Sequence, residues 1–203
     1  MFVRTIYVTG DPKKIDTAVR ALNTEGRELL EERPGYRGSG VFVDRELGKL
    51  LGLSWWDSME ARRNSDEVMR QHRAALLGAF AGTLTVENFE AVVSHTLQPP
   101  RVGGGLRVTR VEFEPADADL FAETFRTTVV PLLETMPGLA RAGLFIDRER
   151  GTGRVGTLFV DRDSMVASRA GQAAARHEGA AKARVSVVGL EEFEVLHADV
   201  RID

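Results

Sequence analysis

Two histidines of this chain have the chemistry of a general base. His72 and His177 lie in stretches with helical spacing, and each has an arginine beside it, Arg73 and Arg176. A histidine near its ordinary pKa can remove a phenolic proton and leave an electron-rich anion that reduces molecular oxygen directly. A solvated helix surface is the alternative interpretation of both positions. No two histidines are four residues apart, so the sequence gives no support to a histidine metal site on a helix.

Two tryptophans could contact an aromatic ligand. Trp55 and Trp56 are the only tryptophans, and they end a predicted strand. Successive strand residues point to opposite faces, so we expect one indole to face the helices and the other a partner sheet. We take Trp55, Trp56 and His177 as candidate substrate-binding residues. Packing in the core is the alternative for the two indoles.

One predicted helix carries several arginines. They are Arg62, Arg63, Arg70 and Arg73, with acidic residues at helical spacing between them. A solvated surface of mixed charge explains this pattern. Alternatively, one arginine turned inward could hold a substrate oxyanion or carboxylate, and Arg63 and Arg70 are the candidates for that role.

These residues belong to a chain that repeats itself. Residues 34–46 match residues 137–149 at an offset of 103 residues, and residues 86–92 match residues 190–196 at an offset of 104. Two copies of one domain in one chain constrain the fold strongly.

Each copy has the pattern strand, helix, strand, strand, helix, strand. The first copy predicts strands over residues 2–9, 39–44, 49–56 and 83–94, with helices that begin after Asp11 and at Asp57 or Ser58. The second copy predicts strands over residues 106–113, 143–147, 157–161 and 185–196, with helices over 118–136 and 165–183. Pro131 should kink the first helix of the second copy, since proline removes a backbone donor.

This order is that of a ferredoxin-like domain, and it predicts an α+β fold. We expect one domain over residues 1–96, a linker over residues 97–105 and a second domain over residues 106–203. Each four-stranded sheet would carry helices on one face. Because the other face keeps apolar side chains, we expect the two sheets to pack face to face as an intramolecular α/β barrel.

Composition limits the partners. The formal net charge of −3 argues against a nucleic-acid partner, and the absence of cysteine excludes disulfides and thiolate metal sites. No apolar stretch approaches the roughly 20 residues of a membrane span. The N-terminal residues lack the pattern of a secretory signal, so we expect a cytoplasmic protein without a membrane partner.

Three local patterns carry a resemblance to a known family. They are Pro34-Gly35 and Pro137-Gly138 before strands, Trp56-Asp57-Ser58 before the second helix, and Ser65-Asp66-Glu67-Val68 followed by His72. With them the chain resembles a tandem member of the antibiotic biosynthesis monooxygenase-like family, in the dimeric α/β-barrel superfamily. That superfamily includes cofactor-free oxygenases that make quinones from polyketide-type phenols, haem-degrading enzymes, small dismutases and isomerases, and proteins of no known activity.

The resemblance implies a cofactor-independent monooxygenase of an aromatic, polyketide-like small molecule in secondary metabolism. Molecular oxygen would be the co-substrate, and no cofactor is expected. Asn64 matches an asparagine of quinone-forming relatives and would position the substrate oxygen. Trp56 would line the pocket, His72 would act as base, and Arg63 or Arg70 would hold the anion. The chain would be a monomer with a pseudo-dimeric barrel, or a homodimer of it.

Two alternatives stay open. One is a non-catalytic small-molecule-binding or pathway-accessory protein. The other is a haem-binding or haem-degrading relative. His72 matches the histidine that haem-degrading relatives use, whereas Arg62 stands at the position of their tryptophan and the first strand has no asparagine.

Overall fold

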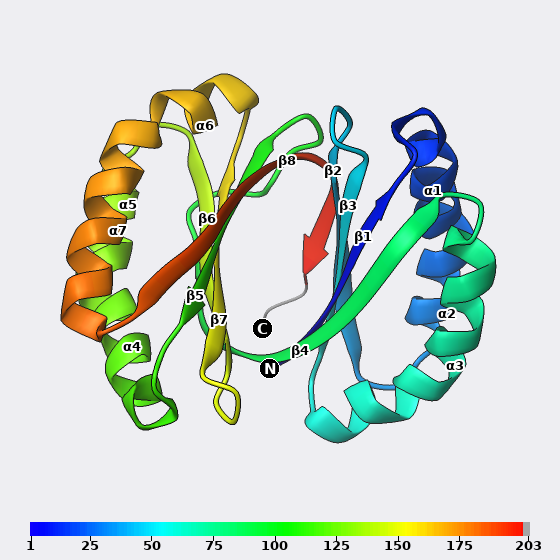
Figure 1. The fold of residues 1–203 in the computed structure, drawn as a ribbon, viewed down its shortest axis with the longest axis horizontal. Coiled ribbons are helices and arrows are strands. Elements are labelled where there is room, and N and C mark those ends of the chain that lie inside the picture. The colour runs from blue at the N-terminus through cyan, green and yellow to red at the C-terminus, as the bar shows by residue number, and fades with distance from the viewer. Residues whose placement is uncertain (201–203) are drawn as a thin grey trace. The chain divides into compact units, whose positions relative to one another are not determined.

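A computed structural model describes residues 1–200 and divides into two compact units. Unit 1 contains Met1–Asn88 and the residues from Val195 onward, and unit 2 contains Phe89–Glu194. In each unit an antiparallel sheet carries helices on one face (Figure 1). The predicted α+β class with two ferredoxin-like copies is confirmed.

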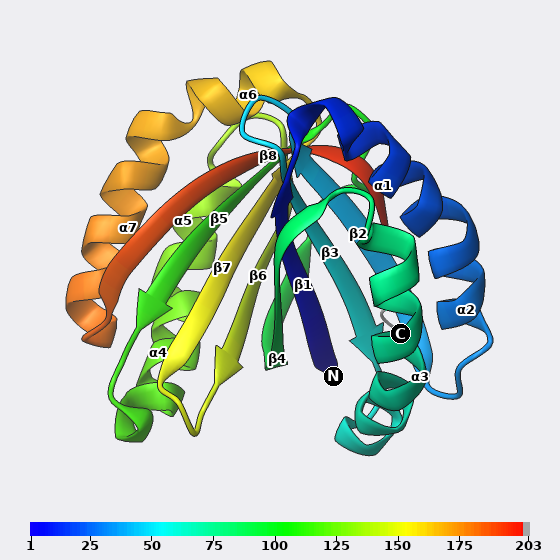
Figure 2. The ribbon, with the colours of Figure 1, turned by 45° about the vertical axis from the view of Figure 1, so that its right-hand side comes forward.

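Unit 1 follows the predicted order of elements. They are β1 (Phe2–Gly10), η1 (Pro12–Lys14), α1 (Ile15–Ala21), η2 (Leu22–Gly26), α2 (Arg27–Glu31), β2 (Tyr36–Asp44), β3 (Lys49–Trp56), α3 (Met59–Leu77) and the first part of β4 (Ala81–Thr96). The strands lie in the order β4-β1-β3-β2, and the end of β8 (Ser186–Val200) follows β2. Figure 2 shows β1, β3 and β2 side by side with α1, α2 and α3 on one face.

Unit 2 repeats this plan. Its elements are β5 (Gly105–Glu112), η3 (Pro115–Asp117), α4 (Ala118–Thr124), η4 (Phe125–Val129), α5 (Val130–Glu134), β6 (Leu139–Asp147), β7 (Thr152–Phe159), α6 (Arg162–Ala167), α7 (Arg169–Ala183) and the first part of β8. The strands lie in the order β8-β5-β7-β6, and the end of β4 follows β6. The last strand of each copy therefore begins in its own unit and ends in the sheet of the other.

Local sequence explains where the helices of unit 1 begin. The carboxylate of Asp11 accepts a hydrogen bond from the backbone N–H of Lys13 at 3.0 Å, and Pro12 occupies the first helical position. The hydroxyl of Ser58 accepts from the N–H of Ala61 at 3.0 Å. Of the two expected caps for α3, Ser58 is therefore the one that the structure uses.

Both units have a π-helical segment in their first helix. In unit 1 it spans Leu22–Gly26, and in unit 2 it spans Phe125–Val129. Pro131 follows the second segment in the first turn of α5, where a missing N–H costs little. Since Glu28 stands at the corresponding position of unit 1, the irregularity belongs to the repeat and does not depend on proline.

The second helix of unit 2 differs from its prediction. It begins at Arg162, where Asp161 caps it, and it is interrupted at Ser168. The hydroxyl of Ser168 donates to the carbonyl of Met165 at 2.7 Å. Ser65 makes the same bond to Arg62 inside the uninterrupted α3, so this bond alone does not explain the interruption.

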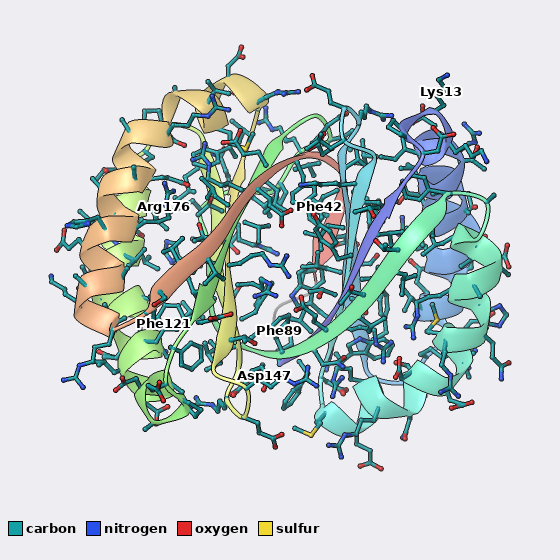
Figure 3. The ribbon with its side chains drawn as sticks, in the orientation of Figure 1. Lys13, Phe42, Phe89, Phe121, Asp147 and Arg176 are labelled. Carbon is teal, nitrogen blue, oxygen red and sulfur yellow. The ribbon has the colours of Figure 1, made fainter. Side chains whose placement is uncertain are left out.

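Each unit has a core between its sheet and its helices. In unit 1 it includes Val8, Leu50 and Leu77, and in unit 2 it includes Phe159 and Phe121, which projects from α4 (Figure 3). Among residues 1–200, no helix is both long and apolar enough to cross a membrane.

Candidate functional site

A row of polar side chains crosses the helix-facing surface of the sheet in unit 1. Arg4 on β1 and Ser39 on β2 both pair with Ser54 on β3, and all three residues are buried. Because residues four apart in a strand share a face, Arg4 points to the same side as Val8, which belongs to the core. The row therefore lies between the sheet and the helices, where apolar side chains are the rule.

A cavity of about 50 Å³ adjoins this row, measured as the space open to the centres of water-sized molecules. One water needs roughly 10–15 Å³ on this scale, so the cavity has room for several water-sized groups. Its polar lining residues are Arg4, Ser39, Ser54 and Arg73. Its apolar side chains are Ile6, Leu22, Leu30, Val41, Leu53, Met69 and Leu76. An apolar wall with a few convergent polar groups is typical of small-molecule sites.

Arg4 has few partners for a buried cation. The residue is 2% exposed, and its Nη2 donates to the backbone carbonyl of Arg62. Its Nε and Nη1 have no hydrogen-bond partner within residues 1–200. Its Nε lies 3.5 Å from Oδ1 of Asp66, and its guanidinium carbon lies 5.5 Å from the centre of the Trp56 ring. Two of the three guanidinium nitrogens thus have no acceptor among the described residues.

The surroundings of Arg4 carry an excess of positive charge. Burial, together with the charges of Arg73 and Arg62, lowers the pKa of Arg4 to about 10, although Asp66 opposes the shift. Burial alone would raise the pKa of Asp66, but a hydrogen bond from Arg73 and the charge of Arg4 lower it overall. Arg73 donates to Asp66 at 2.9 Å. One carboxylate therefore faces three guanidinium groups.

Unit 2 has a counterpart, Arg107, which is 1% exposed and fully partnered. Its Nε and Nη2 donate to one oxygen of Glu192 at 2.9 and 2.6 Å. Its Nη1 donates to Ser168 at 3.0 Å and to Gln172 at 2.7 Å, and its Nη2 also donates to the carbonyl of Met165 at 2.7 Å. These five hydrogen bonds give each of the five N–H groups of the guanidinium an acceptor. Arg176 on α7, labelled in Figure 3, corresponds to Arg73, and burial lowers its pKa.

None of the predicted site residues is part of the lining of this cavity, Trp56 included. Trp56 is fully buried beneath the guanidinium of Arg4, and its Nε1 donates to Ser54 at 3.1 Å. Trp55, next in the strand, points to the opposite face of the sheet. His72 is half-buried on α3 and does not line the cavity.

The remaining predicted residues lie on the surface. Asn64, Arg63 and His177 are exposed. Arg70 is exposed as well, and it donates to both oxygens of Glu67, at 2.8 and 2.9 Å. Their assignment to the site stays a prediction.

Sequence reasoning missed Arg4. A signal was present, because Arg4 and Arg107 are separated by the same 103 residues as the matching segments of the repeat. Both interrupt a strand of apolar and β-branched residues. A charged residue at one strand position in both copies indicates an interior role, because a solvent-exposed charge need not recur there.

The cavity does not fit haem. Haem iron is held by histidine, cysteine or tyrosine, or by methionine together with histidine. The lining contains Met69 but no histidine, cysteine or tyrosine. Within residues 1–200, no three acidic, histidine or cysteine side chains form a potential metal site.

No family model matches the chain. Two curated relatives match it along its whole length, and both are uncharacterized proteins of Mycobacterium tuberculosis. Rv2558 is 27% identical over 205 residues, which cover 100% of this chain and 86% of the relative. Rv2557 is 25% identical over 202 residues, which cover 100% of this chain and 90% of the relative.

Solved structures share the fold. A proposed monooxygenase of Fusobacterium nucleatum superposes with a TM-score of 0.72 at 14% identity, covering 98% of this chain and 94% of that one. An anthrone oxidase-like protein gives a TM-score of 0.71 at 14% identity, covering 97% and 91%. A haem-degrading enzyme of Listeria monocytogenes gives 0.56 at 8% identity, covering 96% and 99%. At identities this low, the superpositions show a common fold and no more. That common fold confirms the resemblance seen in the sequence.

Proposed function

We propose that the chain is a cofactor-independent monooxygenase of an aromatic, polyketide-like small molecule in secondary metabolism, and that the cavity of unit 1 is its site. The observation that carries the proposal is Arg4, a buried guanidinium with unpartnered N–H groups beside an apolar cavity. The names of the structural neighbours support the class of reaction, and the residues of the cavity support the class of substrate.

A buried positive charge favours the ionised form of a bound phenol. Arg4 and Arg73 would hold the resulting oxyanion, while Trp56 would keep Arg4 in place. His72 is the proposed proton acceptor, because Met69 and Leu76, at helical spacing on either side of it, line the cavity.

The reaction needs no external reductant. The ionised substrate would pass an electron to molecular oxygen, and the two radicals would combine at carbon to form a peroxide. Loss of water from the peroxide leaves one oxygen atom as a carbonyl. One O₂ is consumed for each substrate, both reducing electrons come from the substrate, and one water is released.

Oxygen uptake with a metal-free panel of anthrones and hydroquinones tests this proposal. Arg4→Gln should reduce uptake about 100-fold, the scale seen when one donor to a developing oxyanion is removed. Arg20→Gln is the matched control, since Arg20 is exposed on α1 of the same unit. Uptake that is the same in wild type, Arg4→Gln and buffer would contradict the proposal.

A second candidate is a non-catalytic binding protein. It is favoured by one observation: the cavity lining, as described, contains no carboxylate and no imidazole that could act as base. This candidate predicts saturable binding of panel members without oxygen uptake, and no effect of His72→Ala on affinity.

A further inference from the structure

The repeat provides an internal comparison for Arg4. Arg4 on β1 and Arg107 on β5 are 103 residues apart, and both are buried. Each donates from Nη2 to a helix carbonyl, at Arg62 and Met165, which are also 103 residues apart. The two guanidinium groups thus have equivalent positions in their units, so their other neighbours can be compared directly.

Unit 2 supplies Arg107 with its own anion. Glu192 pairs with Arg107 across β5 and β8, and one carboxylate oxygen accepts from both Nε and Nη2. Ser168 and Gln172 accept from Nη1. A ligand could reach this guanidinium only by displacing side chains of the protein.

Unit 1 differs at two of these three positions, because Ser65 corresponds to Ser168 and makes the same bond to a helix carbonyl. The repeat aligns Asn88 with Glu192 and Met69 with Gln172. Met69 lines the cavity and offers no oxygen to a guanidinium. Among the described residues, Oδ1 of Asn88 is buried without a hydrogen-bond partner, and so are Nε and Nη1 of Arg4. Among the described residues, no carboxylate is therefore hydrogen-bonded to Nε of Arg4, although Oδ1 of Asp66 lies 3.5 Å from it.

The charges around Arg4 favour an anion in that place. Asp66 is the carboxylate in ion-pair range of Arg4, and it already accepts a hydrogen bond from Arg73. The side chain of Asp66 is 48% exposed, so water screens its effect on Arg4. A buried cation without full compensation is costly, and an anionic ligand would remove part of that cost.

We infer that the substrate of unit 1 carries a carboxylate, which accepts a hydrogen bond from Nε of Arg4 as Glu192 accepts one from Nε of Arg107. The apolar walls of the cavity suit the rest of an aromatic carboxylic acid. Unit 2 holds no second site of this kind, because the guanidinium of Arg107 already donates hydrogen bonds to Glu192, Gln172 and Ser168. The inference rests on the proposed function for the location of the site, but it concerns binding alone.

Asn88→Glu tests the inference, because it places in unit 1 the carboxylate that unit 2 already has. Asn88→Gln is the matched control, with the same length and no charge. Benzoate is the probe, and benzamide has nearly the same shape without the charge. Calorimetry should show one benzoate bound per chain, at least about ten-fold more tightly than benzamide. Asn88→Glu should weaken benzoate at least about ten-fold relative to Asn88→Gln.

Three results would overturn the inference. The first is that benzoate binds no more tightly than benzamide, or does not bind at millimolar concentration. The second is that Asn88→Glu and Asn88→Gln bind benzoate equally while both unfold cooperatively. The third is a stoichiometry of two per chain, which would mean that Arg107 is open to ligands.

The same proteins separate this inference from the proposed oxygenation. Oxygen uptake with neutral anthrones, together with equal affinity for benzoate and benzamide, would support the proposed oxygenation. It would contradict the inference that the substrate carries a carboxylate. The predicted differences in benzoate affinity, without oxygen uptake in the presence of any panel member, would support a carboxylate-bearing ligand. They would contradict the proposed oxygenase activity.

Discussion

The guanidinium carbon of Arg4 lies 5.5 Å from the centre of the Trp56 ring, in the interior of unit 1. Trp56 is itself fixed on two sides. It donates to the hydroxyl of Ser54 at 3.1 Å and meets the ring of Tyr36 edge-on at 5.8 Å. The indole therefore stabilises a cation that has few other partners.

Replacing Trp56 by phenylalanine should lower the free energy of unfolding by about 2 kcal/mol, because the variant loses the bond to Ser54 and part of the aromatic surface under Arg4. Ser54→Ala should cost about 1 kcal/mol in the wild type, since it leaves a buried indole N–H unpaired. In the Trp56→Phe background the same change should cost almost nothing. Urea unfolding of the four proteins measures this coupling, and equal costs in both backgrounds would show that the bond contributes nothing.

The two buried arginines should differ in their contribution to stability. Arg107→Met leaves Glu192, Gln172 and Ser168 without their partner, so it should cost about 3 kcal/mol or more. Arg4→Met removes one backbone hydrogen bond, and Asp66 keeps its bond to Arg73, so it should cost clearly less. Denaturant unfolding of both variants makes the comparison. An equal or greater loss in Arg4→Met would mean that Arg4 is chiefly a structural residue.

Anion binding should depend on the protonation of Arg4. Burial lowers the pKa of Arg4 to about 10, well below the ordinary value of a guanidinium, and the guanidinium is charged below its pKa. Benzoate affinity should therefore stay constant while benzoate and Arg4 are both ionised, and it should fall as the pH rises through about 10. Because a bound carboxylate favours the charged form, the midpoint should move upward with benzoate concentration. Titrations in a pH series check this, with circular dichroism as the control for folding, and unchanged affinity well above pH 10 would contradict the assignment of Arg4.

Much of the fold could be predicted from sequence because the two copies constrain one another. The strand over Lys49–Trp56 was predicted with the bounds that the structure has. The strand over Tyr36–Asp44 begins three residues before its prediction. It contains Gly38, whose positive φ of 143° and register shift against Trp55 mark a β-bulge. A bulge interrupts the regular alternation of side chains, so the period-two pattern does not extend across it.

The site could be predicted only in part. The sequence indicated Trp56 and an inward-facing arginine, but the four arginines of α3 lie within one arc of about 100° and do not by themselves reveal which of them is buried. Arg73 lines the cavity, whereas Arg63 and Arg70 lie in solvent. Arg4 follows from the repeat once its match with Arg107 is noticed. The difference between their partners depends on contacts across strands and helices, which a single sequence does not contain.

Residues 1–97 expressed alone should not fold as a stable monomer. Unit 1 includes the residues from Val195 onward, and β2 lies next to β8 in its sheet. A Cβ added at Gly38 would lie 2.1 Å from the carbonyl oxygen of Asp199, which shows how closely the two strands approach. Without β8 the edge of β2 is unpaired, which favours association. Size-exclusion chromatography and urea unfolding test this, and a soluble, monomeric, cooperatively folding fragment would refute it.

The most direct test of the account is the fate of ¹⁸O₂ in a metal-free reaction with an anthrone that carries a carboxylate. The account predicts one ¹⁸O atom in each product molecule and the other in water, with product formation reduced about 100-fold in Arg4→Gln and unchanged in Arg20→Gln. Absence of labelled product in the wild type, or equal labelling in Arg4→Gln, would contradict the claim that the cavity beside Arg4 is an oxygenation site.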